Sequence, residues 1–176
     1  MFTLLVALWI APFDDPKDKA ETSKLILSDA VVCESIAGFA DYVKRDEASL
    51  TRDEKLLVYY QVENFGVERV GKEYQVHLVQ DIRVRRQGQR AVLQSKDKFY
   101  EFKGKSKQRL PWVFMQNTIS LKPYSPGDYE LEIIVHDEIG KGPAVSQILK
   151  FRVKKPDEPK SKEKAEGKEK AKEDGR

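Results

Sequence analysis

The sequence contains few of the residues from which catalytic and metal sites are usually built. Its 176 residues include one cysteine, Cys33, and two histidines, His77 and His136. A single cysteine excludes a disulfide within the chain, and a lone cysteine in an apolar strand is usually a buried, inert hydrophobe. The sequence also lacks the H-E-x-x-H, G-x-S-x-G, P-loop and C-x-x-C patterns of common enzymes and cofactor sites. These absences predict a protein that is not an enzyme and binds no cofactor.

The sequence has no apolar run long enough to span a bilayer as a helix, which takes about 20 residues. The run from Met1 to Ala11 resembles the apolar core of a secretory signal, although the usual positive residues before it are missing. We therefore predict that residues 1–23 are a truncated signal segment with a polar linker, and that the protein is extracytoplasmic, periplasmic or secreted. The alternative is a cytoplasmic protein in which Met1 to Ala11 forms an edge strand. Neither is an integral membrane protein.

A long helical period is missing as well, and apolar residues instead alternate with polar ones along most of the chain. In residues 55–64, for example, Leu56 and Val58 point to one face while Leu57 and Tyr59 point to the other. The pattern predicts strands at 25–33, 55–64, 74–84, 91–94, 118–121, 129–137 and 147–153. Strands of this length, separated by turn residues, predict an all-β fold: an antiparallel two-sheet sandwich of about seven strands.

Three segments do not follow the alternation. Residues 97–116 are irregular and predict one or two short strands with a loop. Residues 49–54 carry a Thr51-x-x-Glu54 capping box, which predicts a brief helical turn. Residues 154–176 hold nine basic and seven acidic residues and no aliphatic side chain larger than alanine, so we expect this Lys/Glu-rich tail to be disordered. The sandwich is therefore predicted to span residues 24–153.

One stretch carries a family resemblance. Residues 121–133, LKPYSPGDYELEI, resemble the L…P-G-x-Y-x-L-x-V signature of immunoglobulin-like and fibronectin type III sandwiches. The resemblance implies that Tyr129 opens the sixth strand and that its hydroxyl holds the preceding corner. Residues 32–65 are more weakly similar to uncharacterised bacterial exported proteins that have one such domain. Leu131 stands where antibody domains have their second disulfide cysteine, and the resemblance implies a fold without an activity.

Charge is unevenly distributed along the chain. Residues 83–109 have ten basic and two acidic side chains, whereas residues 1–82 have nine basic and fifteen acidic ones. Arginine forks match phosphate, sulfate and carboxylate groups, so the basic segment is a candidate polyanion-binding site, with nucleic acid not the expected ligand. The candidate residues are Arg83, Arg85, Arg86, Arg90, Lys103, Lys105, Lys107 and Arg109.

These observations leave three functions open. The leading hypothesis is a non-catalytic interaction module, exported from the cell, that binds a protein or a cell-envelope polymer. The first alternative is a polyanion-binding protein that uses residues 83–109. The second is a metal-dependent enzyme in which His77, His136 and a carboxylate come together on neighbouring strands.

Overall fold

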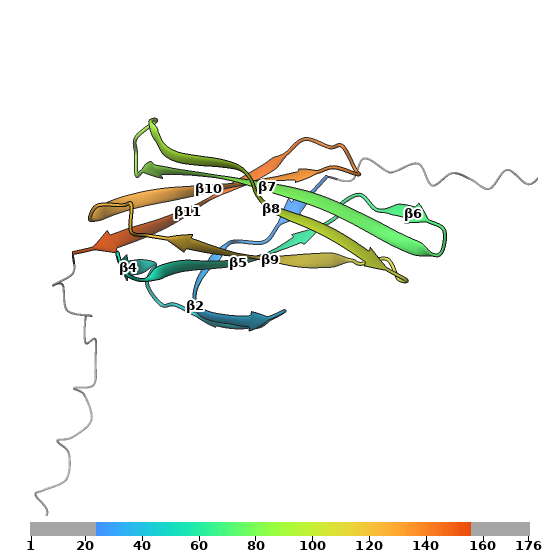
Figure 1. Ribbon diagram of the computed structural model, residues 1–176, viewed down its shortest axis with the longest axis horizontal. Coiled ribbons are helices and arrows are strands. Elements are labelled where there is room, and N and C mark those ends of the chain that lie inside the picture. Colours follow the sequence, from blue (N-terminus) through green and yellow to red (C-terminus); the bar gives the residue numbers. More distant parts are fainter. Residues whose placement is uncertain (1–23, 156–176) are drawn as a thin grey trace, which may run out of the picture.

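The computed structural model describes residues 24–155, and all regular structure in this range is β-strand (Figure 1). The strands are β1 (Ile26–Leu27), β2 (Val31–Gly38), β3 (Asp41–Lys44), β4 (Ser49–Thr51), β5 (Lys55–Glu63), β6 (Glu68–Val70), β7 (Glu73–Arg86), β8 (Val92–Ser106), β9 (Trp112–Ser120), β10 (Gly127–Asp137) and β11 (Val145–Lys154). The prediction of an all-β, two-sheet protein is confirmed, although the described range holds eleven strands and not about seven, because the short strands β1, β3, β4 and β6 were not expected as separate strands. Within the described range, no helix has the length and apolar character needed to cross a membrane. The expected signal segment lies outside the described residues, as does the expected tail except for Lys154, which ends β11, and Lys155.

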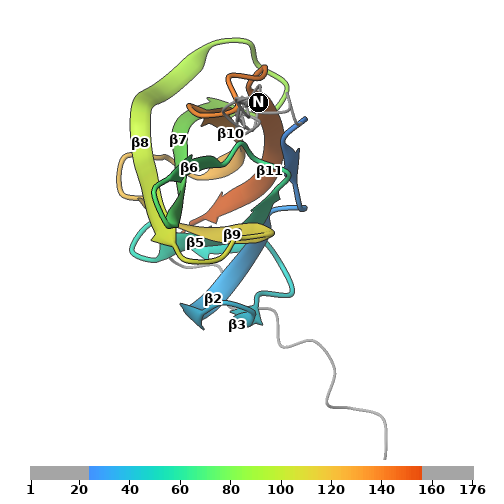
Figure 2. The same ribbon diagram turned by 90° about the vertical axis from the view of Figure 1, so that its right-hand side faces the viewer.

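The first sheet, sheet A, is built around β5. β1 and β2 pair with successive parts of one side of β5, and β9 pairs antiparallel with the other side over the whole strand, from Lys55↔Ser120 to Glu63↔Trp112. β3 extends the sheet beyond β2. Figure 2 shows the β2–β3 hairpin on the side of β5 and β9 that faces away from the second sheet.

The second sheet, sheet B, has the order β4-β11-β10-β7, with β8 on the far side of β7 and the short β6 beside the start of β7. β10 pairs antiparallel with β7 from Tyr129↔Arg86 to Asp137↔Leu78. β4 pairs parallel with β11. The prediction of an antiparallel sandwich is therefore wrong for this pair of strands.

Alternating side chains of the central strands form the core between the two sheets. Leu56, Val58, Tyr60 and Val62 of β5 are buried, on the face that the alternation predicted. β7 and β10 contribute the facing layer in the same way. Its fully or nearly fully buried members are Val76, Leu78, Ile82, Val84, Tyr129, Leu131, Ile133 and Val135. Apolar burial of this kind is the main force that holds such sheets together.

Two predictions of local structure are wrong. Residues 97–116 are not a loop with short strands, because β8 runs for 15 residues from Val92 to Ser106 and β9 begins at Trp112. β8 is an edge strand that is exposed along most of its length, so it lacks the alternation from which strands are recognised. A register shift opposite Asp81, which accepts a hydrogen bond from the Lys98 backbone at 2.8 Å, interrupts its pattern further.

Residues 49–54 are not helical either. Ser49–Thr51 form β4, and a turn follows. The capping-box contact exists within that turn: the Glu54 carboxylate accepts hydrogen bonds from the Thr51 backbone NH at 2.7 Å and from its hydroxyl at 3.1 Å. The same side-chain chemistry that starts a helix therefore closes a strand here.

A buried polar contact joins the two sheets in the middle of the core. The Tyr60 hydroxyl on β5 donates to Oε1 of Gln80 on β7 at 2.7 Å and lies 3.0 Å from the Met115 sulfur. All three side chains have no exposed surface. Burial raises the pKa of Tyr60, which therefore stays neutral.

Replacing Tyr60 with phenylalanine should lower the free energy of unfolding by about 1–2 kcal/mol, because the buried Gln80 oxygen then has no donor. Urea denaturation measures the loss. Tyr59→Phe is the control on the outer face of the same strand, where the hydroxyl accepts only longer bonds of 3.3 and 3.2 Å from Ala40 and Gln61. A larger loss for Tyr59→Phe than for Tyr60→Phe would contradict the assignment.

Candidate functional site

The basic segment does not form one patch. β7 and β8 are antiparallel, with Arg85 beside Val92 at one end and Gln75 beside Lys105 at the other. These ends are ten residues apart along β7, or roughly 33 Å at the rise of an extended strand. The four candidate arginines lie at the first end. Lys103, Lys105, Lys107 and Arg109 follow toward the second.

Several of these cations already have carboxylate partners. Arg85 and Arg83 project from the outer face of sheet B toward Glu132 of β10, which Arg85 bonds directly and Arg83 approaches to 4.0 Å. Lys103 pairs with Glu101 on its own strand at 2.9 Å. Acidic side chains on the same or the adjacent strand therefore offset part of the positive charge of residues 83–109, and this weakens the attraction of the segment for a polyanion.

The two histidines lie on the outer face of sheet B but belong to separate pairs. His77 Nε2 lies 2.8 Å from Glu101, and His136 Nε2 lies 2.8 Å from Asp81. Among residues 24–155, no three His, Cys, Asp or Glu side chains are placed to hold a metal ion. The structure does not bring the two histidines together with a shared carboxylate.

The ion pair between Asp81 and His136 should make the free energy of unfolding depend on pH in the acid range. Burial alone would raise the pKa of Asp81, but the Lys98 backbone NH, the His136 imidazole and the Arg83 charge together hold it below its usual value. A carboxyl group whose folded-state pKa is depressed stabilises the fold above its unfolded pKa, near 3.9. That contribution is lost as the pH falls through the folded value.

We expect Asp81→Asn to cost stability at pH 7 and to cost progressively less as the pH falls below about 4. Urea denaturation of both proteins between pH 3 and pH 7 measures the difference. Two stability curves that stay parallel over this range would show that Asp81 contributes nothing to the acid dependence.

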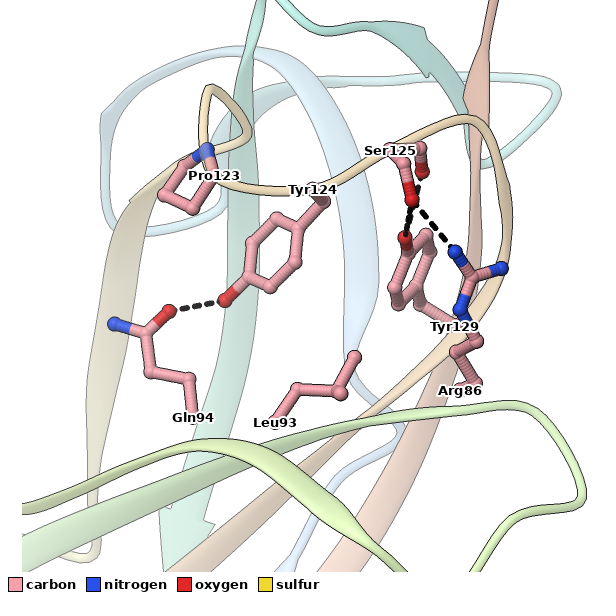
Figure 3. Close-up of a pocket in the computed structure, with 7 residues that line it drawn as sticks. All are labelled: Arg86, Leu93, Gln94, Pro123, Tyr124, Ser125 and Tyr129. Atoms are coloured by element: carbon pink, nitrogen blue, oxygen red, sulfur yellow. Dashed lines mark hydrogen bonds between the residues drawn. The ribbon is translucent and has the colours of Figure 1, made fainter.

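Arg86 lies apart from the other arginines, in a cavity of about 480 Å³ at one end of the sandwich (Figure 3). The end of β7, the start of β8, the β9–β10 loop and the start of β10 form its wall. Lining residues are Arg86, Leu93, Gln94, Pro123, Tyr124, Ser125 and Tyr129. Arg86 and Tyr129 are directly paired across β7 and β10, which brings two segments far apart in the sequence into one site.

Tyr129 organises this end of the domain. Its hydroxyl donates to the Ser125 carbonyl oxygen at 2.6 Å, the type of corner contact that the family resemblance implied. Its ring packs between those of Tyr124 and Phe151, with centroids 5.3 and 5.5 Å away. The Tyr124 hydroxyl donates to Oε1 of Gln94 on β8. Burial and the neighbouring Tyr129 raise the pKa of Tyr124, so the Tyr124 ring is a neutral wall of the cavity.

Arg86 is held in one orientation by uncharged groups. Its guanidinium donates to the Ser125 hydroxyl at 2.6 Å and lies over the Tyr129 ring, 5.3 Å from the centroid. Gly127 has a φ of 148°, and a Cβ there would lie 2.7 Å from Arg86 Nη1, so glycine leaves the space that the guanidinium fills. Within residues 24–155, Arg86 forms no ion pair with a carboxylate, unlike Arg83 and Arg85.

An aromatic cluster on the outer face of sheet A was missed from the sequence. Phe39 of the β2–β3 turn stacks on Trp112 with centroids 3.8 Å apart, and Tyr42 of β3 stacks on Tyr59 at 4.4 Å. Phe114 lies beside Tyr59 at 5.8 Å. The signal was present, because Tyr59 was assigned to the outer face of its strand, where a sandwich usually places polar residues.

Comparison with known proteins gives little similarity. No protein-family model matches the chain, and no curated protein matches it. Among solved structures, a β-glucosidase from Erythrobacter marinus is similar over 74% of this chain, with 12% identity and a TM-score of 0.42. The chain corresponds to 15% of the length of that enzyme.

Proposed function

We propose that this chain is a non-catalytic, immunoglobulin-like binding domain that recognises a protein or a cell-envelope polymer through the cavity around Arg86. The observation that carries the proposal is an arginine held in place at an open cavity without a carboxylate partner in the described chain. Charged groups held in this way, among apolar walls, are typical of binding sites. The split basic segment gives the polyanion alternative no comparable support.

The strand order supports the immunoglobulin-like part of the proposal. In the constant type of such sandwiches one sheet contains the first, second, fourth and fifth strands, and the other contains the third, sixth and seventh. Here β2, β5 and β9 share sheet A, while β7, β10 and β11 share sheet B; β8, the fourth strand in this correspondence, departs from the pattern and lies at the edge of sheet B. The Tyr129 corner lies at the start of β10, the strand that corresponds to the sixth. Loops at the ends of such sandwiches commonly carry their binding residues.

A fragment screen by NMR tests the proposed site. We expect small molecules to shift backbone signals of residues 86–94 and 123–129, and Leu93→Arg to abolish the shifts by filling the cavity mouth. Ile148→Arg is the matched control, because Ile148 is 55% exposed on the outer face of sheet B and Leu93 is 52% exposed. A screen without binders at these residues, or binders that Leu93→Arg leaves unaffected, would overturn the proposal.

Export is part of the same proposal and rests on the apolar run from Met1 to Ala11. Cell fractionation combined with the intact mass of the native protein tests it. An extracytoplasmic protein that is lighter by this segment is the expected result. A full-length protein found in the cytoplasm would overturn export, and the binding partner would then be expected among cytoplasmic proteins.

A further inference from the structure

We infer that the cavity around Arg86 binds a singly charged carboxylate attached to an apolar or aromatic body. The inference rests on the proposed function and adds the chemical class of the ligand. The guanidinium presents N–H groups in a planar fork, and within residues 24–155 its one bond to a side-chain oxygen is the bond to the Ser125 hydroxyl. A fork of this geometry matches the two oxygens of a carboxylate.

The charge of the site favours one negative group. Among the lining residues of the described chain, Arg86 is the only basic side chain, and none is acidic. The nearest arginines along the strand, Arg83 and Arg85, are engaged with Glu132 on the outer face of sheet B. A single cation balances a carboxylate, whereas a doubly charged phosphate would remain half compensated in a partly apolar site.

Two other cavities of the described chain show what this one lacks. One, of about 330 Å³, is lined by Glu47 and Asp128 as well as by Lys150 and Arg152. The other, of similar volume, is lined by Glu63 as well as by Arg109. Both therefore contain acidic side chains that compete for the cation. The lining of the Arg86 cavity contains no acidic residue.

The remaining walls select the body of the ligand. Leu93 is an exposed aliphatic side chain at the mouth, and the Pro123 and Tyr124 rings form another wall (Figure 3). Gln94 uses its Oε1 to accept from the Tyr124 hydroxyl and so fixes that ring at the side of the cavity opposite Arg86. A ligand with a carboxylate at one end and an apolar or aromatic body fits this order of groups.

The test compares 3-phenylpropionate with 3-phenylpropionamide, which differ in charge but hardly in shape, by NMR titration of the full chain. We expect the carboxylate to bind at least about tenfold more tightly, since hydrogen bonds between charged groups are the stronger ones. Phenyl phosphate, which carries more charge, should bind no more tightly than the carboxylate. Equal affinity for acid and amide, or tighter binding of phenyl phosphate, would overturn the inference.

Variants separate this inference from the proposed function. Arg86→Gln should reduce the affinity for the carboxylate to that for the amide, and Arg83→Gln, three residues away and paired with Glu132, should leave it unchanged. Thermal unfolding and backbone spectra establish that both variants are folded. If Arg86→Gln binds the carboxylate as wild type does, the inference is wrong while the binding site can stand. If neither compound, nor any other fragment, binds at the cavity, both proposals fail together.

Discussion

Replacing Gly66 with alanine should lower the free energy of unfolding by about 3 kcal/mol. A Cβ at position 66 would lie 2.3 Å from the Gly140 nitrogen and 2.4 Å from its Cα. Backbone atoms cannot rotate away as the end of a side chain can, so the β5–β6 and β10–β11 loops would have to separate. The backbone of Gly66 does not have a positive φ, so the expected loss comes from the collision alone. Urea denaturation measures it.

Gly38→Ala is the matched control for this experiment. Gly38 also lacks a positive φ, and a Cβ there would meet no atom within 4 Å. Its replacement should change the free energy of unfolding by no more than about 0.5 kcal/mol. If Gly66→Ala were as stable as Gly38→Ala, the close approach of the two loops would be refuted.

Removing the Asp137 carboxylate should have an effect of similar size, a loss of about 3 kcal/mol. Asp137 is 6% exposed at the end of β10 and accepts three backbone hydrogen bonds: from Gly66 at 2.5 Å, from Ile139 at 3.1 Å and from Gly140 at 2.8 Å. In Asp137→Ala these donors lose their acceptor. Thermal denaturation measures the loss, and hydrogen exchange of the Gly66 and Gly140 amides should accelerate most.

Asp128→Ala is the control for Asp137→Ala. Asp128 is on the same strand and also accepts a short bond, from Arg152 at 2.6 Å, but both side chains are largely exposed. Exposed ion pairs contribute about 0–1 kcal/mol, so its removal should have little effect. If Asp137→Ala cost no more stability than Asp128→Ala, the backbone donors around Asp137 would have found other acceptors, and the prediction would be wrong.

The central strands could be predicted from the sequence because each has one buried face. Residues 55–64 and 129–137 were assigned as strands and correspond to β5 and β10, with boundaries that differ by one or two residues. Apolar side chains occupy every second position of both strands, since these positions face the core. The central strand β7 was recognised for the same reason.

Edge structure could not be predicted in the same way. β8 and β3 are mostly exposed on both faces, so no periodic requirement acts on their side chains. β6 and β4 are only three residues long; β6 pairs with β7, the next strand, whereas β4 pairs with β11, which is distant in sequence. Their existence follows from the hydrogen-bonding groups that β7 and β11 leave available, which a single sequence does not reveal.

The candidate site, too, could be predicted only in part from the sequence. The arginines of residues 83–109 were found by counting charge, but counting does not tell which carboxylates face them. Glu132 became the partner of Arg83 and Arg85 only through the register of β10 against β7. That register also pairs Arg86 with Tyr129 and so creates the cavity. Tyr129 was identified beforehand because its corner leaves a local sequence signature.

The rate at which the Cys33 thiol is modified would measure how often the structure around it opens. Its thiol is fully buried on β2, and burial raises its pKa, so a thiol-reactive reagent meets neither an accessible nor a charged sulfur. Cys33 pairs with Leu57 of β5 and with Lys44 of β3, so the packing around these strands must open before the reagent can enter. Because the chain has no second thiol, the rate of modification reports a single event, the local opening of sheet A around β2.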